Sequence, residues 1–533
     1  MSLLIDNPVL LLFIVIGVGG ALGSVRVKGV ALGPAAALFV GLAFSAYDER
    51  LANTPLVVSQ IGLALFIYTI GLASGPSFLA ELRRGGARVL LGASVLLAFV
   101  AVGVVGLASL FDLDAGARAG LFAGSLTNTP ALSAAIEGLA DKIADGSVTD
   151  PVVGYSLAYP LGVVMMLIAA QWSLRRAERA TRAAGPEAPK ATRSATSATV
   201  LVRRDDLPAL GELRHWNGAR LAFSRFEHDG RVELATTDVQ LALGDLCVVI
   251  GAPADVEEFI AWAGERSNRH LALDRSAFDF RRISVSNRAL AGARLGDLDL
   301  EGRFGATVTR VRRGDADVVA DHEFVIRLGD RLRVVGPSAK LPAIATLLGD
   351  SDRSLGEVDA MGFAIGMSIG LLIGLIAIPL PGGGSVELGV GGGPLIAGLV
   401  LGTVSRTGRI TWQVPHAANL TLRQLGILIF LGSVGIRSGA TFADAVGTTI
   451  GARLAGAAVV ATIGIAVASL VMVRLLRSDP VSAAGQIAGV ETQPAVHAYA
   501  AEATNGDERV DAGYALVLPL AMILKLVLVQ LLI

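Results

Sequence analysis

Cysteine and charge are both scarce in this sequence. Its single cysteine, Cys247, excludes an internal disulfide bond and any metal site built from a cysteine cluster. Charged residues make up 17% of the 533 residues, whereas an average soluble domain has about 25%. Hydrophobic residues make up 53%, and several apolar runs approach the roughly 20 residues that cross a bilayer. The composition therefore predicts a polytopic α-helical membrane protein.

Motifs for catalysis and nucleotide binding are also absent. The sequence has no Walker P-loop, no histidine cluster with metal-ligand spacing and no nucleophile elbow. The glycine clusters at 382–384 and 391–393 lie in a predicted membrane loop rather than in a βαβ unit, so they predict no dinucleotide site. The net charge of −1 gives no indication of a nucleic-acid partner. We therefore expect neither an enzyme nor a bound cofactor, metal or nucleic acid.

The chain divides into two apolar blocks around a polar centre. Residues 1–174 form the first membrane block, with spans predicted near 8–24, 28–46, 56–74, 88–110 and 150–171. Residues 355–533 form the second, with spans near 359–379, 392–404, 420–436, 451–473 and 512–532. Between them, residues 175–199 turn basic and then rich in Ala, Pro, Ser and Thr, which is typical of a linker. Residues 200–266 and 277–350 alternate short strands with charged turns, and each predicts a small α+β module.

In each block, a polar segment with a proline interrupts the apolar sequence. The first is Gly124-Ser-Leu-Thr-Asn-Thr-Pro-Ala-Leu132, within residues 119–140, and the second is Gly489-Val-Glu-Thr-Gln-Pro-Ala-Val496, within residues 483–502. An unpaired backbone amide in hydrocarbon costs several kcal/mol, so such a break needs protein or water around it. Two breaks in corresponding places of two halves indicate a transport site.

The two blocks repeat each other in sequence. Residues 60–75 match residues 424–439, and residues 154–161 match residues 513–520 in the positions of Gly, Tyr and Pro. The central modules are also doubled, because the turns Leu243-Gly-Asp245 and Leu328-Gly-Asp330 each precede an apolar strand that ends in glycine. We interpret both patterns as internal duplications.

Lysine and arginine in short loops predict the orientation of the spans. The residues that favour the inner face are Arg26, Lys28, Arg83, Arg84, Arg88, Arg406, Arg409, Arg423, Arg474 and Arg477. This pattern runs in opposite directions in the two blocks, although Arg437 and Arg453 would lie outside. It predicts inverted repeats of five transmembrane helices plus a re-entrant hairpin each. Both termini would lie outside, and residues 175–355 would be cytoplasmic.

These features together resemble the aspartate:alanine exchanger family of bacterial secondary transporters. The resemblance rests on residues 124–132, on Phe66…Gly71…Ser74-Gly75, and on residues 290–330 of the second module. It implies exchange of an acidic for a small amino acid across the inner membrane. It also implies that both modules are cytoplasmic domains like the C-terminal domain of potassium-conductance regulators (RCK-C). The second break departs from the first, since it is one residue shorter and has Glu491 where the first has Leu126.

The candidate substrate-binding residues come mainly from the two breaks. The N-terminus of a half-helix presents free N–H groups and a partial positive charge, which suit an anion. Hydroxyl, amide and carboxylate side chains there suit the carboxylate and amine of a substrate. The alternative is a proline kink whose threonines bond back to their own helix. The candidates in the breaks are Ser125, Thr127, Asn128, Thr129, Pro130, Glu491, Thr492, Gln493 and Pro494.

Three ionisable residues have more specific candidate roles. Glu491, inside a membrane hairpin, is a candidate to pair with a substrate ammonium, carry a proton or hold a cation. Arg437 is a candidate to bind a side-chain carboxylate, with snorkelling to the outer surface as the alternative. His497 is a candidate proton carrier, with helix packing as the alternative. Tyr155 and Tyr514 occupy matching positions and are predicted to line the cavity or to anchor at the interface.

We therefore expect a homodimeric antiporter for small amino acids or dicarboxylates, such as aspartate and alanine. An elevator-like motion is expected, and a rocking motion is the alternative. A second class is an RCK-C-regulated potassium channel or ion permease, although no filter sequence such as Thr-Val-Gly-Tyr-Gly is present. A membrane ligand sensor without transport is the third class. The modules lack the Rossmann half that normally precedes RCK-C, so a small regulatory ligand other than NAD or ATP, or a dimer contact, is expected there.

Overall fold

Apolar helices dominate the computed structural model of the chain. It describes residues 2–25, 33–82, 86–184, 195–274, 278–313, 316–351, 356–379, 385–504 and 507–533. Residues 185–194 of the predicted linker 175–199, residues 381–384 of the predicted membrane loop, and the orientation signals Arg26, Lys28, Arg83 and Arg84 lie outside these described residues.

Within the described ranges, six helices are long and apolar enough to cross a membrane. They are α4 (Leu56–Glu81), α5 (Ala87–Phe111), α9 (Pro151–Ala184), α17 (His416–Val446), α18 (Thr449–Leu475) and α21 (Glu508–Leu531). Shorter apolar helices are α2 (Pro8–Ser24), α3 (Ala35–Tyr47), α15 (Ala360–Gly374) and α16 (Gly389–Val404). Helices of this kind pair their backbone groups internally, as hydrocarbon requires. The prediction of a polytopic helical membrane protein is confirmed.

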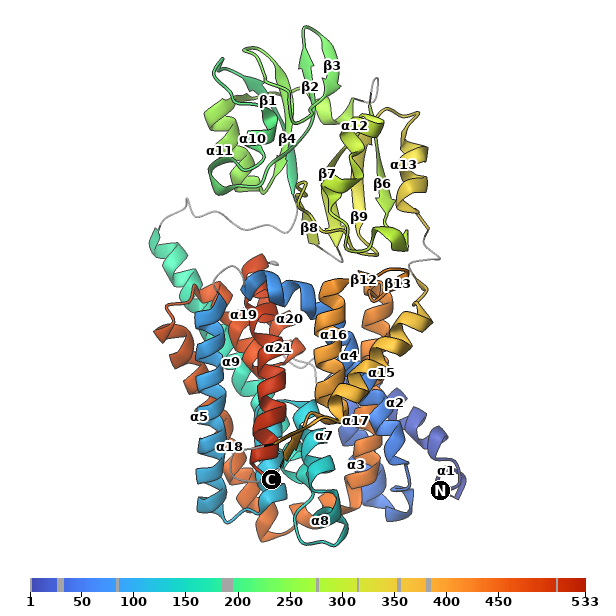
Figure 1. Cartoon of the computed structure of the whole chain (residues 1–533). Coiled ribbons are helices and arrows are strands. Elements are labelled where there is room, and N and C mark those ends of the chain that lie inside the picture. Colours follow the sequence, from blue (N-terminus) through green and yellow to red (C-terminus); the bar gives the residue numbers. More distant parts are fainter. Residues whose placement is uncertain are drawn as a thin grey trace.

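These helices pack as two bundles that lie side by side (Figure 1). One bundle contains α2, α3, α4, α15, α16 and α17, and the other contains α5, α9, α18 and α21. Glycine allows close backbone approach in the first bundle. A Cβ atom added to Gly71 would lie 2.9 Å from the Cα atom of Gly398, so even alanine would separate α4 from α16.

Two helix pairs occupy the segments with the predicted breaks. Helices α6 (Ala115–Ser125) and α7 (Thr129–Gly138) form the first pair, and α19 (Pro480–Glu491) and α20 (Pro494–Ala503) form the second. Both pairs pack within the second bundle, mainly against α9 and α21. Helices α19 and α20 lie at the end near the β-sheets, whereas α7 and the short α8 (Ala140–Ala144) lie toward the opposite end (Figure 1). We call these pairs the first and second hairpin.

The polar centre forms two antiparallel sheets. The first contains β1 (Thr196–Val202), β2 (Ala222–His228), β3 (Arg231–Leu234), β4 (Leu246–Gly251) and β5 (Gly264–Arg266), in the order β3-β2-β4-β1-β5. The second contains β6 (Asp279–Ser284), β7 (Thr307–Arg313), β8 (Ala316–Val318) and β9 (Arg331–Gly336), in the order β6-β9-β7-β8. When the second sheet is read from β8, its order β8-β7-β9-β6 matches the order β3-β2-β4-β1 of the first sheet strand for strand. Helices α11 (Pro253–Ala263) and α13 (Leu341–Leu348) follow the last strand of each pattern.

The second sheet domain rests on the helical bundle through its Leu-Gly-Asp turn. The backbone N–H of Leu328 donates a 3.3 Å hydrogen bond to Gln413, whose side-chain amide donates in turn to Ser405 at 2.8 Å. The equivalent Leu243 of the first sheet domain is 64% exposed. The two copies of one motif therefore have different surroundings.

Candidate functional site

Each hairpin turns at a threonine in the left-handed backbone conformation. The φ angle is +47° at Thr127 and +58° at Thr492, a conformation that costs a non-glycine residue about 1–3 kcal/mol. The next residue then caps the following half-helix. Asn128 accepts a hydrogen bond from the N–H of Ala131, and Gln493 accepts one from that of Ala495. The same turn and cap recur in both hairpins, although the two sequences differ in length.

The two tips touch each other in the interior of the protein. The hydroxyl of Thr127 donates a 3.0 Å hydrogen bond to the carbonyl oxygen of Glu491. The side-chain amide of Asn128 donates a 3.0 Å bond to the hydroxyl oxygen of Thr492. Asn128 and Glu491 are both fully buried. The structure thus brings together residues that were predicted from two separate parts of the sequence.

A lysine from the last long helix completes this crossing. Lys525 in α21 is fully buried, and its ammonium donates to the carbonyl oxygen of Leu126 at 2.9 Å and to the hydroxyl of Thr492 at 3.2 Å. Its charge interacts with that of Glu491. No described residue donates a hydrogen bond to either carboxylate oxygen of Glu491. The crossing therefore holds one basic and one acidic side chain away from water.

Lys525 is absent from the candidates predicted from sequence. A lysine within the apolar run of residues 515–532 is itself a signal of function, because charge in a membrane span is costly and rare. That signal marks the residue but not its partner, since the partner depends on how the helices pack. Glu491 and Lys525 are separated by a hairpin arm and most of α21.

Two tyrosines of α9 hold the tips from one side. The hydroxyl of Tyr155 lies 2.9 Å from that of Thr129, and Gln493 donates a 2.9 Å hydrogen bond to the hydroxyl of Tyr159. The hydroxyl of Ser125 is buried and has no hydrogen-bond partner among the described residues. Helix α9 therefore contacts both hairpins, and Ser125 retains a free donor and acceptor.

A cavity of about 550 Å³ reaches the tip of the second hairpin from between the two bundles. Tyr159, Gln493 and Pro494 line its tip end, and Arg423 and Gln424 of α17 line its opposite wall. A volume of 300–1,000 Å³ is typical of small-molecule sites. The cavity combines apolar walls with amide, hydroxyl and guanidinium groups and the carboxyl group of Glu502, which suit a small polar ligand.

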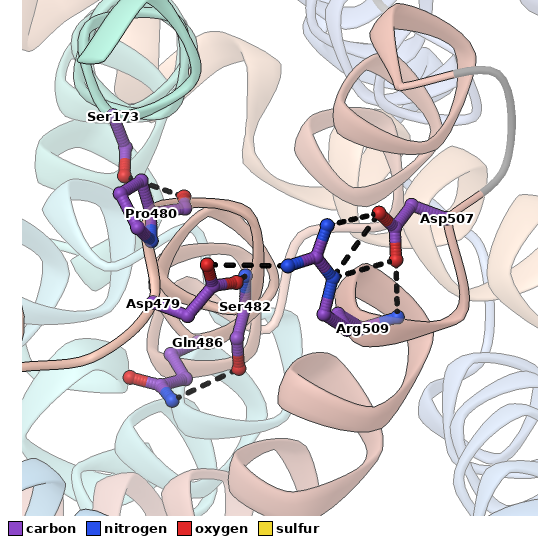
Figure 2. Close-up of polar contacts among 7 residues, drawn as sticks. All are labelled: Ser173, Asp479, Pro480, Ser482, Gln486, Asp507 and Arg509. Carbon is purple, nitrogen blue, oxygen red and sulfur yellow. Dashed lines mark hydrogen bonds and ion pairs between the residues drawn. The ribbon is translucent and has the colours of Figure 1, made fainter. Parts of the chain in front are cut away.

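The base of each hairpin is also fixed, by an aspartate. Asp479 caps α19 through the N–H of Ser482 and forms a 3.2 Å ion pair with Arg509, which also pairs with Asp507 at 2.6 Å (Figure 2). At the other hairpin, Asp114 caps α6 and accepts hydrogen bonds from the N–H and hydroxyl of Thr149. Both aspartates tie the start of a hairpin to the start of the next long helix.

Two predicted residues lie away from the crossing of the tips. Arg437 is exposed on α17 and interacts electrostatically with Asp150, at the start of α9. His497 lies in the arm of the second hairpin, where its Nε2 atom is 2.8 Å from Asp511 and its ring stacks on Tyr514 at 4.3 Å. Neither side chain has a described hydrogen bond or ion pair with the residues that join the tips.

Comparison with known proteins shows that this chain is similar to transporters over its whole length. A family described as "Predicted Permease Membrane Region" matches residues 11–174 and 362–533, and the TrkA-C domain family matches residues 280–349. An uncharacterized transporter of Geobacter sulfurreducens is 40% identical over 100% of this chain and 99% of its own. Uncharacterized transporters of Symbiobacterium thermophilum and Cutibacterium acnes are 39% and 38% identical, each over 99% of this chain and 98% of theirs. No solved structure matches the chain.

Proposed function

The chain belongs to the aspartate:alanine exchanger family, and from that premise we propose that it is a secondary active antiporter. Its substrates are small amino acids or dicarboxylates, such as aspartate and alanine, and it exchanges them across the bacterial inner membrane. The relatives are named transporters, so the proposal adds the substrate class, the exchange and the site. The site is the crossing of the two hairpin tips.

The observation that carries the proposal is the burial of an acidic and a basic side chain together at this crossing. Glu491 and Lys525 are both fully buried, and removing two charges from water is expensive even when they interact. Stability alone favours apolar residues at such positions. Glu491 would pair with the ammonium of a bound amino acid, and Lys525 would pair with the carboxylate of the same substrate. Both residues then have a role in substrate binding. The turn residues Thr127, Asn128, Thr492 and Gln493 supply the neutral polar groups around it.

The cavity between the bundles supports a route to this site. It joins the tip residues Gln493 and Pro494 to Arg423, whose guanidinium suits the second carboxylate of a dicarboxylic substrate. Ser125, Thr129 and Pro130 lie at the other tip, and we assign them to the same binding region. We assign Arg437 and Asp150 to the extracellular opening of the transport path rather than to the binding site. We assign His497 to proton exchange with Asp511.

The proposal includes inverted repeats of five transmembrane helices plus one re-entrant hairpin each. The opposite placement of the two hairpins and their matching turns and caps support it (Figure 1). Both termini lie outside and residues 175–355 lie in the cytoplasm, where the two RCK-C-like domains bind a small regulatory ligand. The tips and bases of the hairpins are bonded to α9 and α21. The bundle that contains α9 and α21 therefore moves together with the hairpins, against the other bundle, in an elevator-like motion. The transporter is a homodimer.

Counterflow in proteoliposomes tests the function. Purified protein is reconstituted with unlabelled aspartate, alanine or succinate inside, and uptake of the labelled compounds is measured. We expect uptake that requires an internal substrate and collapses in the variant Glu491→Gln. Conductance without any internal substrate would instead support a channel, and substrate binding without flux would support a sensor.

A further inference from the structure

The two half-helices before the breaks point their C-terminal ends at the crossing. Helix α6 ends at the cap residue Leu126, and α19 ends at the cap residue Thr492. The last carbonyl groups of a helix lack partners within it and carry a partial negative charge. In transporters built from broken helices, such ends and the unwound carbonyls coordinate the coupling cation.

In this protein the ammonium of Lys525 lies at that place. Its hydrogen-bond acceptors are the carbonyl oxygen of Leu126 and the hydroxyl oxygen of Thr492, at 2.9 and 3.2 Å. Leu126 belongs to the first break and Thr492 to the second. Glu491, the residue before Thr492, adds a fully buried carboxyl group at the same tip. Carbonyl, hydroxyl and carboxylate oxygens are the donors that hard cations prefer.

We propose that Lys525 is a resident cation: its ammonium occupies the site that a coupling Na⁺ would take, so the protein carries no metal cation through this site. The inference rests on the proposed transport function only for its consequence, which is exchange independent of Na⁺. The occupancy itself is a property of the folded protein.

The internal repeat supports a special role for this pair. Tyr514 follows Tyr155 by 359 residues, and Lys525 follows Met166 by the same interval. Thr492 follows Thr127 by 365 residues, and Glu491 follows Leu126 likewise. The positions of the charged pair in the second half are thus held by leucine and methionine in the first, where Met166 is also buried. Because only the second half supplies an acid and a base, the crossing has a single position for a cation.

Removing the ammonium of Lys525 should leave a vacant cation site near the buried carboxyl group of Glu491. The test measures the melting temperature of the full-length protein in detergent, in choline chloride, sodium chloride or methylammonium chloride. We expect the three salts to have equal effects on the wild type. Lys525→Ala should melt at least 5 °C lower in choline chloride and should recover at least half of the loss, saturably, in methylammonium or sodium chloride.

Met166→Ala is the matched control, because it makes a similar truncation at the equivalent position without removing a charge. It should lose stability equally in all three salts. A Lys525→Ala protein that responds as Met166→Ala does would overturn the inference. So would a wild-type protein that sodium chloride stabilises saturably relative to choline chloride.

A second measurement does not depend on folding of the variant. Wild-type counterflow in sodium and in choline buffers should agree within twofold, and a tenfold requirement for Na⁺ would overturn the inference while leaving the transport function intact. If no substrate is exchanged in either buffer, the proposed function fails. The melting experiment then still decides the occupant of the site.

Discussion

The ammonium of Lys525 lies 2.9 Å from the carbonyl oxygen of Leu126 and thereby joins the last long helix to the tip of the first hairpin. It also bonds to Thr492 at the second tip. One side chain therefore connects both broken segments, and Glu491, the neighbour of Thr492, is buried with it. Substrate recognition and stability are coupled at this residue, and the two effects can be separated by mutation.

Lys525→Met should destabilise the protein by about 3–5 kcal/mol, because it leaves Glu491 buried without its counter-charge. The double variant Glu491→Leu with Lys525→Met places the residues of the first half at both positions. We expect it to lie within about 1 kcal/mol of the wild type, because replacing a whole buried pair by apolar residues is often neutral. Denaturant unfolding in mixed micelles measures both. Equal losses in the single and double variants would contradict this coupling.

The sequence contains the signals for the hairpins but not for their contact. Proline next to threonine and asparagine in an apolar run predicts a break, and the structure has its turns at Thr127 and Thr492. The bond between Asn128 and Thr492 joins residues 364 positions apart, and no local pattern encodes it. Arg437 shows the converse: its position in a span suggests a site, but its side chain is exposed and lies away from the crossing of the tips.

Asn128 has two roles that substitution can separate. Its side-chain oxygen caps α7 at Ala131, and its amide nitrogen donates to Thr492. Asn128→Asp keeps the cap but removes the donor, whereas Asn128→Ala removes both. We expect at least tenfold slower exchange in both variants. Alanine should also lose about 1 kcal/mol or more in stability with the cap, and aspartate should lose stability because its added carboxyl group is fully buried. Counterflow and unfolding on the same preparations measure this, and normal exchange by the aspartate variant would remove the tip contact from the mechanism.

Single cysteines test the proposed orientation. Cys247 is fully buried and should stay unreactive, so it serves as the internal control. Ser147 follows α8 and Asn268 follows β5 of the first sheet, and both are exposed. In intact cells, a membrane-impermeant thiol reagent should label Ser147→Cys and leave Asn268→Cys unlabelled until the cells are permeabilised. The reverse pattern would contradict the orientation of both blocks.

The two sheet domains place different cations against equivalent buried aspartates. Asp245 pairs with His228 at 2.7 Å, and Asp330 pairs with Arg313 at 2.6 Å. Each aspartate also accepts a 2.8 Å hydrogen bond from a backbone N–H. The hydrogen bond to Asp245 and its negative charge raise the pKa of His228 above the ordinary value of 6.5. Arginine stays charged throughout the physiological range.

The stabilisation from His228 should therefore depend on pH, and that from Arg313 should not. Because the folded pKa of His228 is raised, its contribution is complete below about pH 6.5 and is lost as the pH rises through the folded value. Asp245→Asn should accelerate amide exchange in β4 more at pH 6 than at pH 9, relative to wild type at the same pH. Asp330→Asn should accelerate exchange in β9 equally at both. Hydrogen-exchange mass spectrometry of the full-length protein, corrected for intrinsic rates, measures both. An Asp245→Asn effect that is the same at pH 6 and pH 9 would show that His228 does not contribute through its charge.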